Sequence, residues 1–166
     1  MFEIKAYDLH WLEDLDDRED LCLHGRAVAK IGEDVIVYDD AAVSATALYL
    51  LKSLTEDHVS GEADVQMLPC CGHFMVANNS LSEVIIVGCA NGIDWSVLHD
   101  GEYVLIVTDT QNEVRLHIDD YKRAVFEFAD EIEAFYNTSA EKVFEDEIDR
   151  DAYTAFWCEW KRRRYS

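Results

Sequence analysis

The side chains best suited to chemistry lie between residues 65 and 76, in the segment VQMLPCCGHFMV. Cys70 and Cys71 are adjacent, and His73 follows two residues after Cys71. A thiolate beside an imidazole is a nucleophile, and the same two groups are common ligands of zinc. The segment therefore suggests two chemical hypotheses, a reactive thiol and a metal site.

A metal site in this segment requires its ligands to converge. Structural zinc takes four ligands, usually from two spaced cysteine pairs. Neighbouring residues of a strand point to opposite faces, so Cys70 and Cys71 share an ion only if the chain turns tightly. Pro69 and Gly72 are residues that suit such a turn, and the metal alternative is therefore Cys70, Cys71 and His73. Other predicted strands offer further ligands: Cys22, His24, Cys89 and His99.

A third interpretation makes the same segment part of the core, and it is the one that we favour. Acidic surroundings raise the pKa of a thiol, and free cysteines are among the most buried residues. We therefore expect residues 65–76 to form a bent core strand, and the five cysteines to be reduced and mostly buried. We expect no catalytic residue, no cofactor and no resident metal, and hence a protein that is not an enzyme.

The charge of the chain indicates what kind of partner its surface suits. There are 35 acidic and 14 basic residues, which give a net charge of −21. Such a surface repels nucleic acid and anionic membranes and attracts a basic protein, although acidity also serves solubility alone. Two acidic runs would form one negative patch if the fold placed them on one side. The residues predicted to bind the partner are Glu13, Asp14, Asp16, Asp17, Glu19, Asp20, Glu145, Asp146, Glu147 and Asp149.

The elements that would position these residues follow from the periodicity of apolar residues. Residues 2–7, 21–31 and 34–39 alternate as strands do, and Gly25 suits a bulge. Residues 40–54 change to helical spacing, which predicts a helix capped by Asp39 or Asp40.

The second half of the chain predicts a meander followed by helices. Residues 83–118 contain four apolar runs separated by turn signals at Asn91-Gly92, at Asp100-Gly101 and in a longer polar turn. Helical spacing returns over 119–137, where Asp119 or Asp120 is expected to cap the helix, and again from Ser139. The chain is therefore predicted to be one α+β domain, residues 1–166. Its antiparallel β-meander sheet would carry one helix after the N-terminal strands and two C-terminal helices packed on one face.

No apolar run reaches the roughly 20 residues that cross a bilayer, and the first residues do not resemble a signal peptide. These features predict a cytoplasmic protein.

In size, charge and layout, and in the hairpin segment GCANGIDWSV at 88–97, the chain resembles the small acidic immunity proteins of bacterial toxin–immunity systems. No motif that defines the family is matched, so no residue role is carried over. The resemblance implies a non-enzymatic protein that neutralises a basic, nuclease-like toxin. The alternatives are a thiol- or metal-dependent protein and a homo-oligomeric structural protein, with a homodimer formed through the aromatic C-terminal helix.

Overall fold

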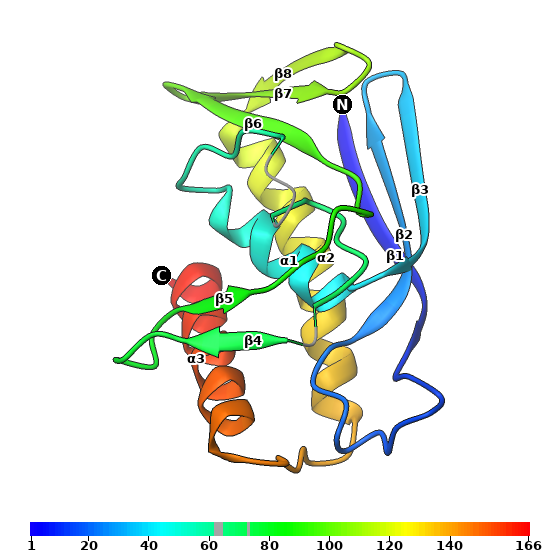
Figure 1. Cartoon of the computed structure of the whole chain (residues 1–166). Coiled ribbons are helices and arrows are strands. Elements are labelled where there is room, and N and C mark those ends of the chain that lie inside the picture. The colour runs from blue at the N-terminus through cyan, green and yellow to red at the C-terminus, as the bar shows by residue number, and fades with distance from the viewer. Residues whose placement is uncertain (62–64, 73) are drawn as a thin grey trace.

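The computed structural model describes residues 1–61, 65–72 and 74–166 and confirms the predicted α+β class (Figure 1). Within these residues there are three helices and three antiparallel sheets. One helix follows the N-terminal strands and two helices end the chain, as predicted. None of the described helices combines the length and the apolarity that crossing a bilayer requires.

The first sheet has the order β1 (Phe2–His10), β2 (His24–Ile31) and β3 (Asp34–Ala41). Its residues alternate between buried and exposed, because one face packs on the core and the other meets solvent. The pairing of β2 with β3 shifts register between Gly25 and Ala27, so the predicted bulge is confirmed.

Helix α1 (Val43–Lys52) follows β3 and is buried along nearly its whole length. The predicted N-cap at Asp39 or Asp40 is wrong. Strand β3 continues to Ala41, which leaves both aspartates in the strand, and Ala42 precedes the helix without a side-chain cap.

The predicted meander is divided between two sheets. Strands β6 (Trp95–Asp100), β7 (Tyr103–Thr108) and β8 (Glu113–His117) form one sheet, with Gly101 at a φ of 63° in the first turn. The run that was expected to precede them is β5 (Val84–Ile86), which pairs with β4 (Met75–Ala77) instead. Asn91-Gly92 therefore does not close a hairpin between neighbouring strands.

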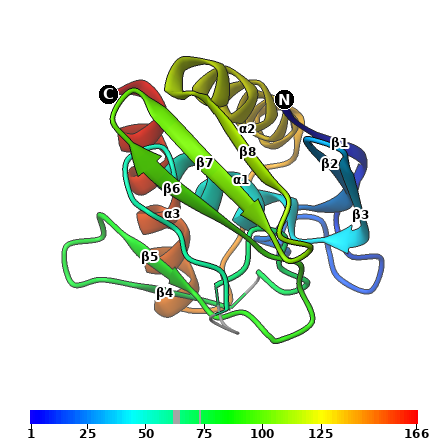
Figure 2. The same cartoon turned by 90° about the horizontal axis from the view of Figure 1, so that it is seen from above.

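Helices α2 (Ile118–Thr138) and α3 (Glu147–Tyr165) complete the fold (Figure 2). The cap of α2 is His117, whose ring accepts from the Asp119 amide, so the predicted cap at Asp119 or Asp120 is wrong. Both aspartates lie in the first turn, where their charge complements the helix dipole.

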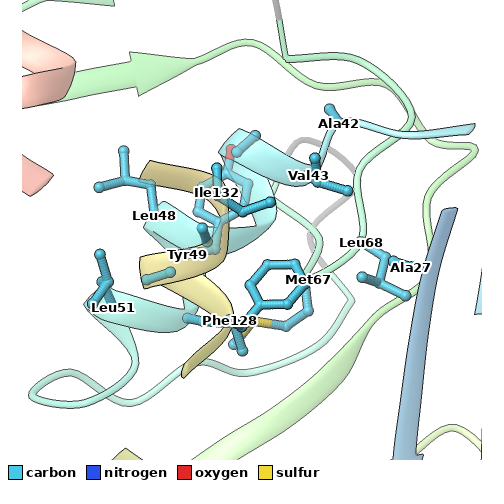
Figure 3. Packing of buried hydrophobic residues seen from close by; sticks show 14 of the residues in the cluster. Ala27, Ala42, Val43, Leu48, Tyr49, Leu51, Met67, Leu68, Phe128 and Ile132 are labelled. Atoms are coloured by element: carbon cyan, nitrogen blue, oxygen red, sulfur yellow. The ribbon is translucent and has the colours of Figure 1, made fainter. Parts of the chain in front are cut away.

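The core lies where α1 and α2 meet each other and the first sheet (Figure 3). Leu48 and Leu51 of α1 and Phe128 and Ile132 of α2 are fully or almost fully buried. Met67, from the irregular segment before β4, is also fully buried in this cluster, and the segment is thereby anchored to the core.

Candidate functional site

The two acidic runs lie side by side at one end of the molecule. The connection between β1 and β2 and the connection between α2 and α3 meet there, at the bottom of Figure 1. The Val143 amide donates to the Arg18 carbonyl at 2.9 Å, and Arg18 Nε lies 3.4 Å from the Glu141 carbonyl oxygen. We call the exposed surface of residues 13–19 and 141–149 the acidic face.

A lysine holds the two connections together. Lys142 Nζ donates to the carbonyl oxygens of Asp17 and Asp20, at 2.6 Å each, and lies 3.1 Å from the centre of the Trp11 ring. Burial lowers the pKa of Lys142 to about 8, although the nearby carboxylates of Asp20, Asp17 and Asp16 act in the opposite direction. The ammonium group is half-buried, and its hydrogen bonds go to backbone carbonyl oxygens of the face.

The carboxylates of the acidic face are largely without counter-ions. Among the described residues, Arg150 supplies its ion pairs, one to Glu147 at 3.6 Å and one to Asp151, at the edge of the face, at 3.4 Å. The C-terminal arginines serve other parts of the molecule: Arg162 pairs with Glu83, Arg163 with Glu56 and Glu159, and Arg164 with Asp130. Negative charge is thus left unneutralised at this end.

Asp20 does not belong to the exposed face, so its prediction as a partner-binding residue is wrong. Its side chain is 1% exposed and closes the base of the acidic loop. One carboxylate oxygen accepts from the Leu12 amide at 2.8 Å, and the other accepts from the Cys22 amide at 3.0 Å. Two backbone donors at the neck of the loop explain why an acid is buried there.

Two further residues that were predicted to bind the partner accept hydrogen bonds from nearby backbone amides. Asp146 caps α3, because its carboxylate accepts from the amides of Ile148 and Asp149. Asp16 accepts from the Arg18 amide at 2.9 Å. Both side chains remain exposed, as do those of Glu13, Asp14, Asp17, Glu19, Glu145 and Glu147, and Asp149 is half-buried.

Exposed apolar side chains lie among these carboxylates. Leu15 is 47% exposed, Phe144 is 36% exposed and Ile148 is 62% exposed. Sequence reasoning missed them because Leu15 and Ile148 are single apolar residues among charged ones, and Phe144 has only Val143 beside it. Apolar anchors within a charged rim are the usual composition of a protein-binding surface.

The second group of candidate residues is the cysteine cluster, formed by Cys70, Cys71 and Cys89. A disulfide joins Cys70 to Cys89, and the Cys71 sulfur lies 3.3 Å from that of Cys70 and 3.5 Å from that of Cys89. All three are half-buried. His24 and His99 lie outside this cluster, and His73 lies outside the described residues.

The cluster corrects two predictions. Residues 69–72 are irregular and do not form a core strand; β4 begins only at Met75. The five cysteines were expected to be reduced and mostly buried, but Cys70 and Cys89 form a disulfide, and of the free thiols Cys22, Cys71 and Cys158 only Cys22 is buried. Cys22 is 1% exposed, and burial raises its pKa to about 12. Cys158 is exposed.

Two histidine–aspartate pairs were not anticipated. His58 Nε2 lies 2.7 Å from Asp94 Oδ1, which also accepts from the Met67 amide at 3.1 Å. His99 Nδ1 lies 2.8 Å from Asp57 Oδ1, and the hydrogen bonds from His99 lower the pKa of Asp57. Since each aspartate also accepts from a backbone amide, the two pairs tie Asp57, His58 and Met67 to the β6 region.

Comparison with protein-family models, with curated proteins and with solved structures found no match to this chain.

Proposed function

We propose that the protein binds a basic protein partner through the acidic face, in the cytoplasm, and that it catalyses no reaction. The observation that carries this proposal is the joining of two distant acidic runs into one face whose carboxylates have few counter-ions. Uncompensated charge at one end of a molecule accelerates encounter with an oppositely charged protein.

The proposal assigns different tasks to the two kinds of side chain on the face. Exposed acids such as Asp14, Asp17 and Glu19 attract the partner and set its orientation, because rim charges act mainly on association. Leu15, Phe144 and Ile148 supply apolar contacts that slow dissociation.

The partner that this chemistry fits is a cationic toxin of the nuclease type, and the protein would act as its immunity protein. A nuclease presents positive charge at the site that holds the phosphate backbone. An acidic face docked there would block the nucleic acid by charge and by shape.

The test begins with a variant of the face that keeps the size of its side chains. Asp14→Asn, Asp17→Asn and Glu19→Gln together remove three exposed charges, and no described residue donates a hydrogen bond to any of these three carboxylates. The matched control is Glu33→Gln, Asp109→Asn and Glu113→Gln, which removes three exposed charges from the β2–β3 turn, the β7–β8 turn and β8. In Figure 1 the two turns and the start of β8 lie at the top of the molecule, and the acidic face lies at the bottom.

The wild type, the face variant and the control are used to capture proteins from an extract of the source cells at low and at high salt. We expect a basic protein that the wild type and the control retain at low salt and that the face variant loses. With that protein purified, we expect its association rate to fall roughly tenfold for the face variant alone. Equal retention by the face variant, or no basic protein retained at low salt, contradicts the proposal.

A further inference from the structure

The cysteine cluster lies in an interruption of one long antiparallel ribbon. Strands β4 and β5 pair Met75 with Ile86, and farther along the ribbon Leu68 pairs with Ile93 through two hydrogen bonds, at 2.9 and 3.0 Å. Both pairs belong to the same register, so the segments between them have equal length. Among the described residues between them, the Val87 amide bonds to the Phe74 carbonyl, and beyond that bond the ladder stops until Leu68.

The interruption changes the direction of the thiols. In a continuous strand Cys70 and Cys71 would point to opposite faces. Here their sulfur atoms lie 3.3 Å apart and both face Cys89 on the other segment. The disulfide between Cys70 and Cys89 explains why those two sulfur atoms lie close together. It does not explain why the Cys71 sulfur lies within 3.5 Å of both.

The backbone around the cluster is held from both sides. The Pro69 carbonyl accepts from the Ala42 amide at 2.8 Å, and the Gly92 amide donates to Gln66 Oε1 at 2.9 Å. Gly72 packs so closely that an added Cβ would lie 2.9 Å from the Cys22 sulfur. The three sulfur atoms are therefore positioned before any ligand arrives, which lowers the entropy cost of binding one.

A single thiophilic cation explains all three positions. Thiolates select soft or borderline ions such as Zn²⁺, and three thiolates with one Zn²⁺ leave one negative charge where three would otherwise stand. We propose that Cys70, Cys71 and Cys89, when reduced, form a metal site to which the described residues supply three thiolate ligands, and that the disulfide is its oxidised, metal-free state.

The conversion between the two states balances with a thiol reductant. The Cys70–Cys89 bond takes up two electrons and two protons from a dithiol, which becomes a disulfide, and two thiols result. Zn²⁺ then binds the three sulfur atoms as thiolates, and the three thiol protons are released to solvent. Metal and disulfide therefore exclude each other, and a reducing compartment favours the metal.

The experiment measures zinc binding by the full chain, after reduction by a dithiol and its removal under anaerobic conditions, against a chromophoric zinc chelator. We expect one Zn²⁺ per chain in the reduced protein and none at this site in the disulfide form. Cys71→Ser should weaken binding roughly a hundredfold, which corresponds to about 2.7 kcal/mol. Cys158→Ser, which changes an exposed thiol outside the cluster, should bind as the wild type does.

Two further measurements keep the result unambiguous. Cobalt in place of zinc should give the thiolate charge-transfer absorption that a carboxylate site lacks, and Cys71→Ser should reduce its intensity. Mass spectrometry of oxidised Cys71→Ser should still find the Cys70–Cys89 disulfide, which shows that the ribbon has folded. Absence of zinc binding by the reduced wild type, or unchanged binding by Cys71→Ser, overturns the proposal.

Discussion

Lys142 places its ammonium nitrogen 3.1 Å from the centre of the Trp11 ring, between two connections that are far apart in the chain. The same atom donates to the carbonyl oxygens of Asp17 and Asp20. Because burial lowers the pKa of this lysine to about 8, the charge is held there at a cost in stability, which the two hydrogen bonds and the ring contact offset. The effect of Lys142 is therefore to join the two halves of the acidic face.

Lys142→Met should separate the two connections while the rest of the fold persists. We expect the exchange of the Val143 amide, which donates to Arg18, to accelerate roughly tenfold, because a local contact of about 1.4 kcal/mol is lost. The global free energy of unfolding should change by less than about 1 kcal/mol, since the cost of burying the charge disappears too.

Hydrogen-exchange mass spectrometry or NMR would measure this difference, with Lys161→Met, an exposed lysine of α3, as the control. Unchanged exchange over residues 12–20 and 139–146 would show that Lys142 does not join the connections.

The base of the acidic loop is held by a tyrosine of α2. The Tyr136 hydroxyl donates to the Leu21 carbonyl at 2.8 Å and accepts from the Leu23 amide at 3.1 Å. Tyr136→Phe removes both bonds and leaves a buried carbonyl without this donor, so we expect a loss of about 1–3 kcal/mol in the free energy of unfolding. Urea denaturation would measure it. Tyr7→Phe, at a side chain that is 47% exposed, should change stability by far less.

The elements that the sequence predicts correctly are those set by local patterns. Alternation in residues 2–7 marks β1, the glycine at 25 marks the bulge, and helical spacing after Asp119 marks α2. Each of these patterns depends on residues a few positions apart. Helix caps were less predictable, since any aspartate near a boundary suits the pattern, and the end of β3 decides between the alternatives.

The candidate sites depend on contacts between distant residues, and there the sequence is less informative. Asp20 looks like every other acid of its run, and only the two amides that it accepts show that it is buried. The bond from Lys142 to Asp17 spans 125 positions, and nothing in either segment indicates it. Cys89 is separated from Cys70 by 19 positions, and the break in the ribbon that lets Cys71 join them leaves no periodic signal.

The buried thiol of Cys22 makes stability depend on pH under alkaline conditions. Burial raises its pKa from 9.0 to about 12. Between these values the unfolded chain loses the thiol proton while the folded chain keeps it, so the free energy of unfolding falls as the pH rises from 9 towards 12. Three pKa units correspond to roughly 4 kcal/mol at the end of that range.

Denaturation of the wild type and of Cys22→Ala at several pH values would isolate this contribution. As the pH rises from 9 towards 12, we expect the free energy of unfolding to fall more for the wild type than for Cys22→Ala. This holds regardless of which protein is more stable at pH 8. Cys158→Ala, at an exposed thiol, should leave the pH dependence as it is in the wild type. A pH-independent difference for Cys22→Ala would contradict the burial of the thiol.

The last prediction concerns Glu159, whose side chain is fully buried between α1, α3 and β5. Its carboxylate accepts from the Val84 amide at 2.9 Å and from Arg163 Nε at 2.9 Å, and it lies 3.3 Å from Lys52 Nζ. Glu159→Gln keeps the shape of the side chain but removes the negative charge that lies between Lys52 and Arg163. Removing one partner of a buried ion pair costs about 3 kcal/mol or more, so we expect a loss of that order.

Thermal or urea denaturation would measure the loss, and Glu127→Gln on the exposed side of α2 provides a control of the same chemistry. The arginine should be affected as well: with Glu159 neutral, the remaining ion pair of Arg163 among the described residues is the one with Glu56, at 2.6 Å, and the end of α3 should exchange its amides faster. A melting temperature within one degree of the wild type would mean that Lys52 and Arg163 reach solvent or other anions once Glu159 is neutral. The ion network would then not be what fastens α3 to α1.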